Sequence, residues 1–290
     1  MMRVLGVAAM SLLLLAASCD VRAQEATSIP LDLTGPRPTA QLRIGESEPV
    51  TAIFDTGAAA SVLRLEYAQR LALPSEGQAA AHGPGGTPLE GYRTTIRNGR
   101  LGDASFGDAM AVALDIQLPL EGVDAIISPG VFTGRYVRFD FANSTAHILP
   151  RTPQNRPPGE ATPYRGEVAH GRMTQTPGVD VQLPNVGTVT AVLDTGSPRG
   201  LTLPLDLAGQ LPLIGELAPR APIRLVGVEH RAFTGRIAGA VRVGPLTLED
   251  VEVNFGDGIE ESIVGMEILR NTEIVLDPQA RQSWLLAPAR

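Results

Sequence analysis

Two short acidic motifs are the residues most able to do chemistry. Asp-Thr-Gly occurs at residues 55–57 and again at residues 194–196, each time directly after an apolar run. Two carboxylates held within hydrogen-bond distance cannot both ionise easily, so such a pair keeps one proton over a wide pH interval. The ionised member can accept a proton from water while the protonated member donates to a carbonyl oxygen. Asp55 and Asp194 are therefore the candidate catalytic pair, with water as the nucleophile.

The residues beside the two acids suit this role. Gly57 and Gly196 permit a tight turn and the close approach of another backbone, where a Cβ would clash. Thr56 and Thr195 carry hydroxyls that can hydrogen-bond across a twofold axis and lock the two turns together. We therefore expect each half of a twofold arrangement to supply one carboxylate, with a cleft at the interface.

The regions around the two motifs also repeat. Each motif follows a segment that reads as strand, turn and strand, and precedes a segment with helical spacing, at residues 66–73 and 204–211. The segment that starts at Ile126 matches the one that starts at Ile263, an offset of 137 residues, and the two Asp-Thr-Gly motifs are offset by 139. The sequence therefore predicts two copies of a β-rich unit of about 110 residues.

These repeats divide the chain into four parts. We expect a targeting segment at residues 1–23, a first lobe at 38–150, a linker at 151–166 and a second lobe at 167–290. The linker is rich in proline and polar residues, which is typical of a connecting segment. An ordered strap across the back of the molecule would have the same composition.

The N-terminus has the features of an export signal. Arg3 precedes an apolar run at residues 4–17, which is too short to span a bilayer comfortably but fits the apolar part of a signal peptide. Cleavage before Gln24 would release a soluble periplasmic or secreted protein. Alternatively, residues 15–19 resemble a bacterial lipobox, and cleavage there would leave a lipidated Cys19 as a membrane tether. Cys19 is the single cysteine, so no internal disulfide is expected in either case.

Composition narrows the class of protein further. Apolar residues make up 43% of the chain, enough for a core, and they recur in short runs between plentiful Gly and Pro, which indicates many short strands. The net charge is −7 without a basic cluster, which argues against a nucleic-acid partner. His, Cys and carboxylates do not cluster at metal-ligand spacing, and no Gly-x-Ser-x-Gly elbow is present. We expect neither a metal nor a cofactor.

The paired motifs, together with the apolar segments at 126–127 and 263–265, resemble the aspartic protease superfamily. Each half resembles a retropepsin-like unit of bacterial type, and the fused pair resembles the two-lobed pepsin plan. The resemblance covers roughly residues 42–286. It implies a mainly β fold with two homologous β-barrel lobes and a cleft between them, in a monomer that forms an internal pseudo-dimer.

Two positions depart from the family pattern. Ser128 stands where the family has a glycine behind the first catalytic turn, so the packing behind Asp55 is expected to differ. Ala58 follows the first motif, whereas Ser197 follows the second. In the family a hydroxyl at this position often bonds the catalytic carboxylate. The two acids are therefore expected to be electrostatically unequal, with Asp194 as the ionised partner.

The family covers its cleft with hairpins, and two segments occupy the corresponding places. These are residues 79–97 and residues 223–237, which could equally be ordinary exposed loops. Glycines at a hairpin tip would allow the mobility that a flap needs. The candidate substrate-binding residues at the two tips are Gly85, Gly86, Val228 and His230.

The resemblance and the acid pair together predict an exported aspartic endopeptidase. It would bind extended polypeptide as an added strand, through backbone hydrogen bonds. The alternative is a non-catalytic peptide-binding protein on the same two-lobed fold, although a binder has no need for a close carboxylate pair. An envelope structural protein is a third hypothesis, which predicts no cleft.

Overall fold

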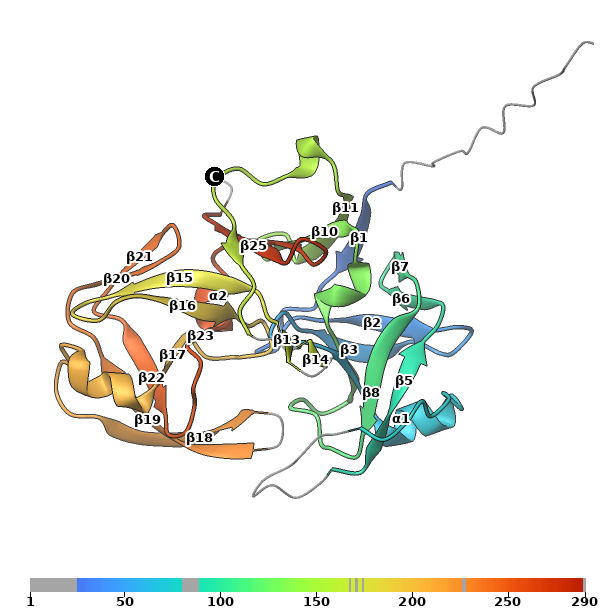
Figure 1. The fold of residues 1–290 in the computed structure, drawn as a ribbon, viewed down its shortest axis with the longest axis horizontal. Helices are drawn as coiled ribbons and strands as arrows, with labels where there is room; N and C mark the ends of the chain where they lie inside the picture. Colours follow the sequence, from blue (N-terminus) through green and yellow to red (C-terminus); the bar gives the residue numbers. More distant parts are fainter. Residues whose placement is uncertain are drawn as a thin grey trace, which may run out of the picture.

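The protein is mainly β and has two β-barrel lobes, as the sequence predicts (Figure 1). In the described part of the chain, the strands form an eight-stranded, a nine-stranded and a six-stranded sheet and one small hairpin. The computed structural model describes residues 25–79, 89–166, 168–169, 172–173, 175–225 and 228–288.

The first lobe is built on the eight-stranded sheet. Its strand order is β5-β8-β4-β9-β3-β2-β6-β7. The elements of this lobe are β2 (Thr39–Ile44), β3 (Val50–Phe54), β4 (Ser61–Arg64), α1 (Leu65–Arg70), β5 (Gly91–Ile96), β6 (Gly99–Leu101), β7 (Ala104–Phe106), β8 (Ala109–Leu114), β9 (Val123–Ile127) and the 3-10 helix η2 (Pro129–Phe132).

The second lobe is built on the nine-stranded sheet. Its strand order is β18-β19-β22-β17-β23-β16-β15-β20-β21. The elements of this lobe are β15 (Gly178–Leu183), β16 (Gly187–Leu193), β17 (Leu201–Pro204), the 3-10 helix η4 (Leu205–Gln210), β18 (Ala218–Leu225), β19 (Val228–Arg236), β20 (Ala240–Val243), β21 (Leu246–Glu249), β22 (Glu252–Gly256), β23 (Ile263–Val264) and α2 (Met266–Leu269).

The two sheets share one strand order. From β5 to β7 in the first lobe, each strand has a counterpart in the same place between β19 and β21 of the second, and β18 is added at the edge. The pairing directions agree as well: β3 is parallel to β9 as β16 is parallel to β23, and β4 is parallel to β8 as β17 is parallel to β22. The lobes therefore have the same topology.

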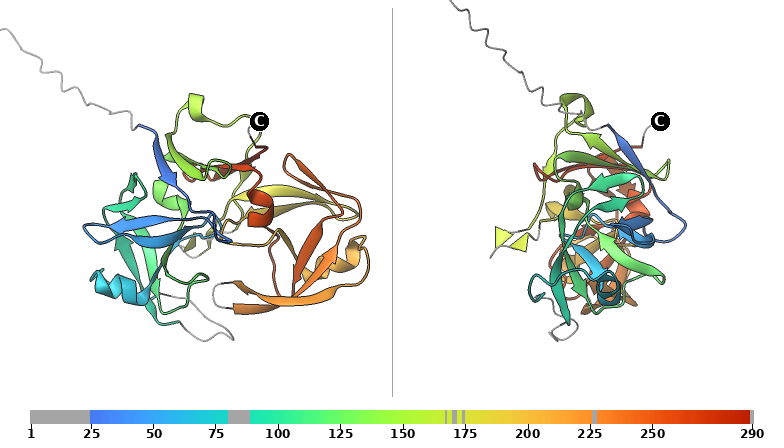
Figure 2. Two further views of the ribbon diagram at one scale, coloured as in Figure 1. Left: turned by 180° about the vertical axis from the view of Figure 1, so that it is seen from behind. Right: turned by 90° about the vertical axis from the view of Figure 1, so that its right-hand side faces the viewer.

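A six-stranded sheet joins the lobes, and Figure 2 shows from behind that they lie side by side next to it. At its centre, β10 pairs antiparallel with β24, and Arg138 lies opposite Val275. These two residues are separated by 137 positions, the offset of the sequence repeat, so the pair marks a local twofold axis. The strands of this sheet are β1 (Thr27–Pro30), β10 (Arg135–Asp140), β11 (Thr145–Pro150), β12 (Thr162–Pro163), β24 (Glu273–Asp277) and β25 (Gln282–Leu286).

The segment between the lobes has structure of its own. Residues 151–166 contain a 3-10 helix, η3 (Pro153–Asn155), and β12, which pairs with β25 at the edge of the six-stranded sheet. A short hairpin of β13 (Val168–Ala169) and β14 (Arg172–Met173) follows it. Part of the expected linker is therefore an ordered strap.

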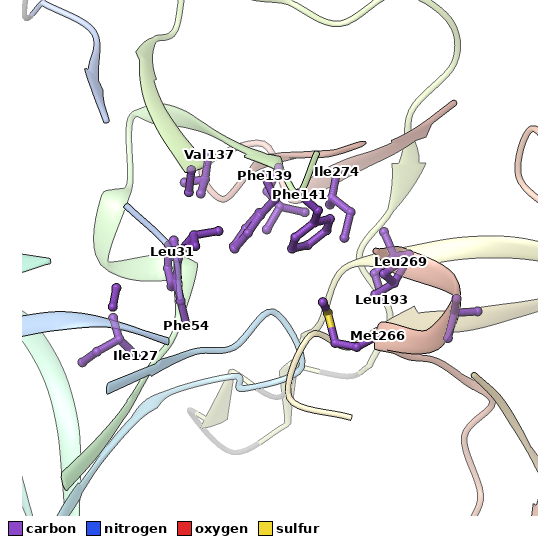
Figure 3. Close-up of a cluster of buried hydrophobic side chains, with 14 of the residues drawn as sticks. Leu31, Phe54, Ile127, Val137, Phe139, Phe141, Leu193, Met266, Leu269 and Ile274 are labelled. Carbon is purple, nitrogen blue, oxygen red and sulfur yellow. The ribbon is translucent and has the colours of Figure 1, made fainter. Parts of the chain in front are cut away.

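One continuous core runs beneath the joining sheet and into both lobes (Figure 3). Phe139 of β10 is fully buried, with its ring centroid 4.8 Å from that of Phe54 and 5.7 Å from that of Phe141. Phe54 is the last residue of β3 and directly precedes Asp55. Burial of these rings therefore anchors the strand that carries the first catalytic candidate.

The helical segments are shorter than the sequence spacing predicts. The segment at 66–73 forms α1 over Leu65–Arg70, and Ala72 then takes a positive φ of 50°, which ends the helix. The segment at 204–211 forms η4, a 3-10 helix. No helix in the described ranges is long and apolar enough to cross a membrane. The predicted signal segment, Cys19, Gly85 and Gly86 lie outside the described residues.

Replacing Phe139 by Ala should destabilise the whole protein, because it leaves a cavity where both lobes meet the joining sheet. The expected loss in the free energy of unfolding is about 3–5 kcal/mol, measured by denaturant titration. Met110→Ala is the control, because Met110 is 62% exposed and its truncation should change stability by less than about 0.5 kcal/mol. Similar losses for both variants would contradict a shared core.

Candidate active site

The site begins at the ends of two equivalent strands. Asp55 follows β3 and Asp194 follows β16, and each backbone N–H donates to the last carbonyl of a parallel neighbour strand. Asp55 N lies 3.0 Å from the oxygen of Ile127, and Asp194 N lies 2.9 Å from that of Val264. Parallel pairing thus fixes the backbone of both acids before their side chains make any contact.

Four hydrogen bonds lock the two turns together. Each threonine N–H donates to the hydroxyl of the other threonine, Thr56 to Thr195 and the reverse, both at 3.0 Å. Each hydroxyl then donates to a backbone carbonyl of the opposite lobe: Thr56 Oγ1 to Leu193 at 2.6 Å, and Thr195 Oγ1 to Phe54 at 2.8 Å. Both threonines are almost fully buried. The bonds cross the local twofold and hold the two acid-bearing strands in register.

The two glycines leave room for the carboxyl groups of the opposite turn. A Cβ on Gly57 would lie 2.5 Å from Cγ of Asp194, and a Cβ on Gly196 would lie 2.3 Å from Oδ2 of Asp55. Side-chain Cβ atoms essentially never approach other atoms so closely. Each carboxyl therefore rests against the backbone of the other turn, and only glycine permits this approach.

The carboxyl groups of Asp55 and Asp194 also hydrogen-bond each other. Both side chains keep some solvent exposure at the surface of the site. Burial by the surrounding groups raises the pKa of both carboxyls, and the Asp55 charge raises the pKa of Asp194 further, to well above its ordinary range. The pair therefore retains one proton at pH values where isolated aspartates have lost theirs.

Asp55 is the acid whose pKa is raised less. Its Oδ1 accepts backbone N–H groups from Gly57 at 2.8 Å and Gly196 at 3.2 Å, and both bonds lower its pKa against the effect of burial. The larger rise, on Asp194, favours the opposite of the sequence expectation, and which acid is ionised stays a prediction. Ser197 donates its backbone N–H to Asp194 Oδ1 at 3.0 Å.

The two lobes differ behind their catalytic turns, where the sequence departs from the family pattern. A Cβ on Gly265 would lie 2.3 Å from the carbonyl oxygen of Arg199, so the second lobe admits only glycine there. Ser128 stands at the equivalent position of the first lobe, where its backbone N–H donates to the Ser61 hydroxyl at 3.2 Å. Its own hydroxyl accepts the N–H of Gly130 and caps η2. The serine thus fits through a different set of hydrogen bonds.

An arginine that the sequence analysis did not single out lies beside the acid pair. Arg37 Nε donates to the carbonyl oxygen of Gly196 at 2.5 Å, and its charge attracts both carboxylates. Burial lowers the pKa of its guanidinium. The residue lies in the loop before β2, between two prolines. A comparison of the two repeats could have identified it, because the equivalent residue, at an offset of 139, is the uncharged Thr176.

Of the candidate flap residues, only His230 is described with its side chain. The side chain of Val228, like Gly85 and Gly86, lies outside the described residues. His230 lies in β19, and its Nδ1 is 3.0 Å from the carbonyl oxygen of Asp257. Among the described residues, no group of three or more His, Cys, Asp or Glu could hold a metal ion.

Comparison with known families points to the same chemistry as the geometry. Residues 40–128 match the model of a family described as aspartyl protease. The match supports the aspartyl protease superfamily. The matched segment runs from β2 through the Asp55 turn to the residue after β9, so it contains the acid, the threonine and the glycine of the first half-site. No curated protein matches the chain.

Replacing Thr195 by Val keeps the shape of the side chain but removes its hydroxyl. The Thr56 N–H and the Phe54 carbonyl then lose buried partners, which should lower the free energy of unfolding by about 2–4 kcal/mol. Denaturant titration measures the loss. Thr195→Ser keeps the hydroxyl and should recover most of the stability, and equal losses in the two variants would contradict the hydrogen-bonded lock.

Stability should fall as pH rises through the raised pKa of Asp194. The folded protein holds this proton while the unfolded chain releases it near pH 4, so the stabilising contribution is present below pH ~4 and is lost as pH approaches the folded pKa. Asp194→Asn removes that titration. The stability of this variant relative to wild type should therefore increase from pH 4 to pH 7, as measured by thermal unfolding.

Asp206→Asn is the matched control, because Asp206 is exposed on η4. Its stability relative to wild type should not vary with pH in this way. A constant difference between Asp194→Asn and wild type across the range would show that the proton is not held.

Proposed function

We propose that this protein is an aspartic endopeptidase whose two lobes arose by internal duplication and together form one pepsin-like site. The observation that carries the proposal is the hydrogen-bonded carboxyl pair, one acid from each lobe, with unequal pKa shifts. The match of residues 40–128 to an aspartyl protease family and the shared strand order of the lobes support it.

The unequal pair assigns the acid and the base. Asp55, the ionised member, accepts a proton from a water molecule, whose oxygen attacks the carbonyl carbon of the peptide bond. Asp194, the protonated member, donates its proton to the carbonyl oxygen as the tetrahedral intermediate forms. The intermediate collapses when the proton held by Asp55 passes to the amide nitrogen, which leaves with its electron pair. Asp194 recovers its proton from the intermediate's hydroxyl, and the starting state returns.

The substrate in this proposal is extended polypeptide, bound between the lobes. A pocket beside Asp194 is lined by residues of both lobes, including Pro119 from the first and Ile223 from the second. The β18–β19 hairpin supplies Ile223, and its backbone could pair with an extended chain. One chain supplies both acids, so the proposed active form is a monomer with an internal pseudo-dimer.

The proposed location is outside the cytoplasm, in the periplasm or secreted. The support is the positively charged start and the apolar run at residues 4–17. Release before Gln24 would give a soluble enzyme. Lipidation of Cys19 would give one tethered to the membrane.

The decisive experiment is peptide cleavage by the purified chain with and without each acid. Wild type should cut a mixed peptide pool, with products identified by mass spectrometry, and a statine-type transition-state mimic should inhibit it. Asp55→Asn and Asp194→Asn should each lower kcat/KM by about 10²–10⁴-fold, the range that general acid–base catalysis contributes.

Asp206→Asn, which removes an exposed acid, should cleave like wild type. If the folded wild type binds peptides without cutting them, the non-catalytic binding protein becomes the better description. Cleavage that survives either Asn change would rule out the carboxyl pair as the catalyst.

A further inference from the structure

The pocket beside Asp194 carries positive charge from both lobes. It has a volume of about 270 Å³ and opens beside the protonated acid. Arg37 reaches it from the first lobe and Arg199 from the second, whereas Asp194 is the only acidic residue among the described residues of its lining. Two guanidinium groups therefore outnumber the single negative charge of a singly protonated carboxyl pair.

Arg37 has hydrogen-bond donors beyond the one that it uses. Its one hydrogen bond among the described residues runs from Nε to the carbonyl oxygen of Gly196, and the bond leaves both terminal nitrogens without a protein acceptor. A guanidinium held at Nε is already oriented, so little further side-chain entropy is lost when a ligand binds its other nitrogens. Both terminal nitrogens can then bond the two oxygens of a carboxylate.

Arg199 is held in place by neutral groups. Nη1 donates to the Asn254 side chain at 3.2 Å, and Nη2 donates to the carbonyl oxygens of Ala221 at 2.7 Å and Pro222 at 3.2 Å. None of these acceptors carries a charge, so the bonds fix the guanidinium without neutralising it.

The charged groups around Arg199 lie outside the pocket lining and largely balance one another. Exposed Glu267 attracts Arg199, while Arg220 repels it. Arg220 is itself paired with Glu252 at 2.5 Å. Burial lowers the pKa of both Arg199 and Arg37, so each charge is held in surroundings where an incoming anion would be stabilising.

The positions equivalent to the two arginines hold uncharged residues. Pro38 and Pro177 are equivalent, because each accepts an N–H from the residue that precedes a catalytic acid. The residue before Pro177 is Thr176, which occupies the place of Arg37. At the offset of 139, the counterpart of Arg199 is Ala60. Arg37 and Arg199 therefore have no basic counterpart at the equivalent positions on the other side of the acid pair.

We infer that this pocket is a subsite for an acidic side chain of the substrate, Asp or Glu, next to the scissile bond on the Asp194 side. The inference rests on the proposed function and names its substrate class. Pro119, Ile223 and Ile263 supply apolar walls that limit water around the ion pair. An uncharged side chain there would give the two guanidinium groups of the pocket no anionic group of the substrate to bind, so Gln in place of Glu should be disfavoured.

The test uses matched fluorogenic peptides that differ by Glu or Gln at single positions flanking the cleaved bond. At one position, wild type should prefer Glu by about tenfold or more in kcat/KM at pH 6, where the Glu side chain is ionised. Arg37→Gln and Arg199→Gln should each bring that ratio close to one. Arg37→Lys keeps the charge and should retain most of the preference, even though it loses the bond to Gly196.

Arg43→Gln is the matched control, because Arg43 is exposed on β2 and its loss removes the same charge from outside the site. It should leave the Glu-to-Gln ratio unchanged. Absence of a Glu preference in wild type at every position, or a ratio that Arg37→Gln and Arg199→Gln leave unchanged, would overturn the inference.

A binding measurement separates this inference from the proposed function. Asp55→Asn, expected to bind without cutting, is titrated with the same peptides at pH 6 by fluorescence anisotropy. Tighter binding of the Glu peptide that depends on Arg37 and Arg199 supports the acidic subsite, even if wild type cleaves nothing and the protease proposal fails. Equal affinities for the Glu and Gln peptides refute the subsite, even if wild type is an active protease.

Discussion

Two carboxylates at close range repel each other, and the site has to hold the two acids together against this repulsion. Asp55 and Asp194 come together only because the surrounding backbone leaves them no room to separate. The threonine lock fixes the distance between the turns, and the glycines let each carboxyl rest on the opposite backbone. The pair then resolves the repulsion by keeping a proton, which is the property that acid–base chemistry requires.

The scaffold that holds the pair extends well beyond the site. Reciprocal hydrogen bonds of about 3 Å are short-range contacts, and they hold only if both strands are rigid. The parallel neighbours β9 and β23 fix the strand ends, and the β10–β24 pairing fixes the angle between lobes. A ring contact connects the joining sheet to the strand ends that carry the acids, because Phe139 belongs to the joining sheet and Phe54 immediately precedes Asp55.

The two lobes have nearly symmetric backbones, but the groups around the acid pair differ between them. Symmetric acids would share their proton equally, but the backbone N–H groups around this pair are arranged differently: Oδ1 of Asp55 accepts those of Gly57 and Gly196, and Oδ1 of Asp194 accepts that of Ser197. The same logic places Arg37 on one side of the pair and Thr176 on the other. Small differences between the lobes thus support the proposed assignment of base and acid and give the proposed subsite a direction along the substrate.

Residue type and spacing along the chain were enough to predict the repeat, the two acids, and the threonines and glycines beside them. The choice of which acid keeps the proton is made by contacts that exist only in the folded chain. That choice depends on which N–H groups point at which oxygen, and Ser197 contributes its backbone where its hydroxyl was expected. Arg37 was missed for a related reason. Its contact with Gly196 joins residues 159 positions apart, and the residues next to Arg37 in the sequence do not indicate such a contact.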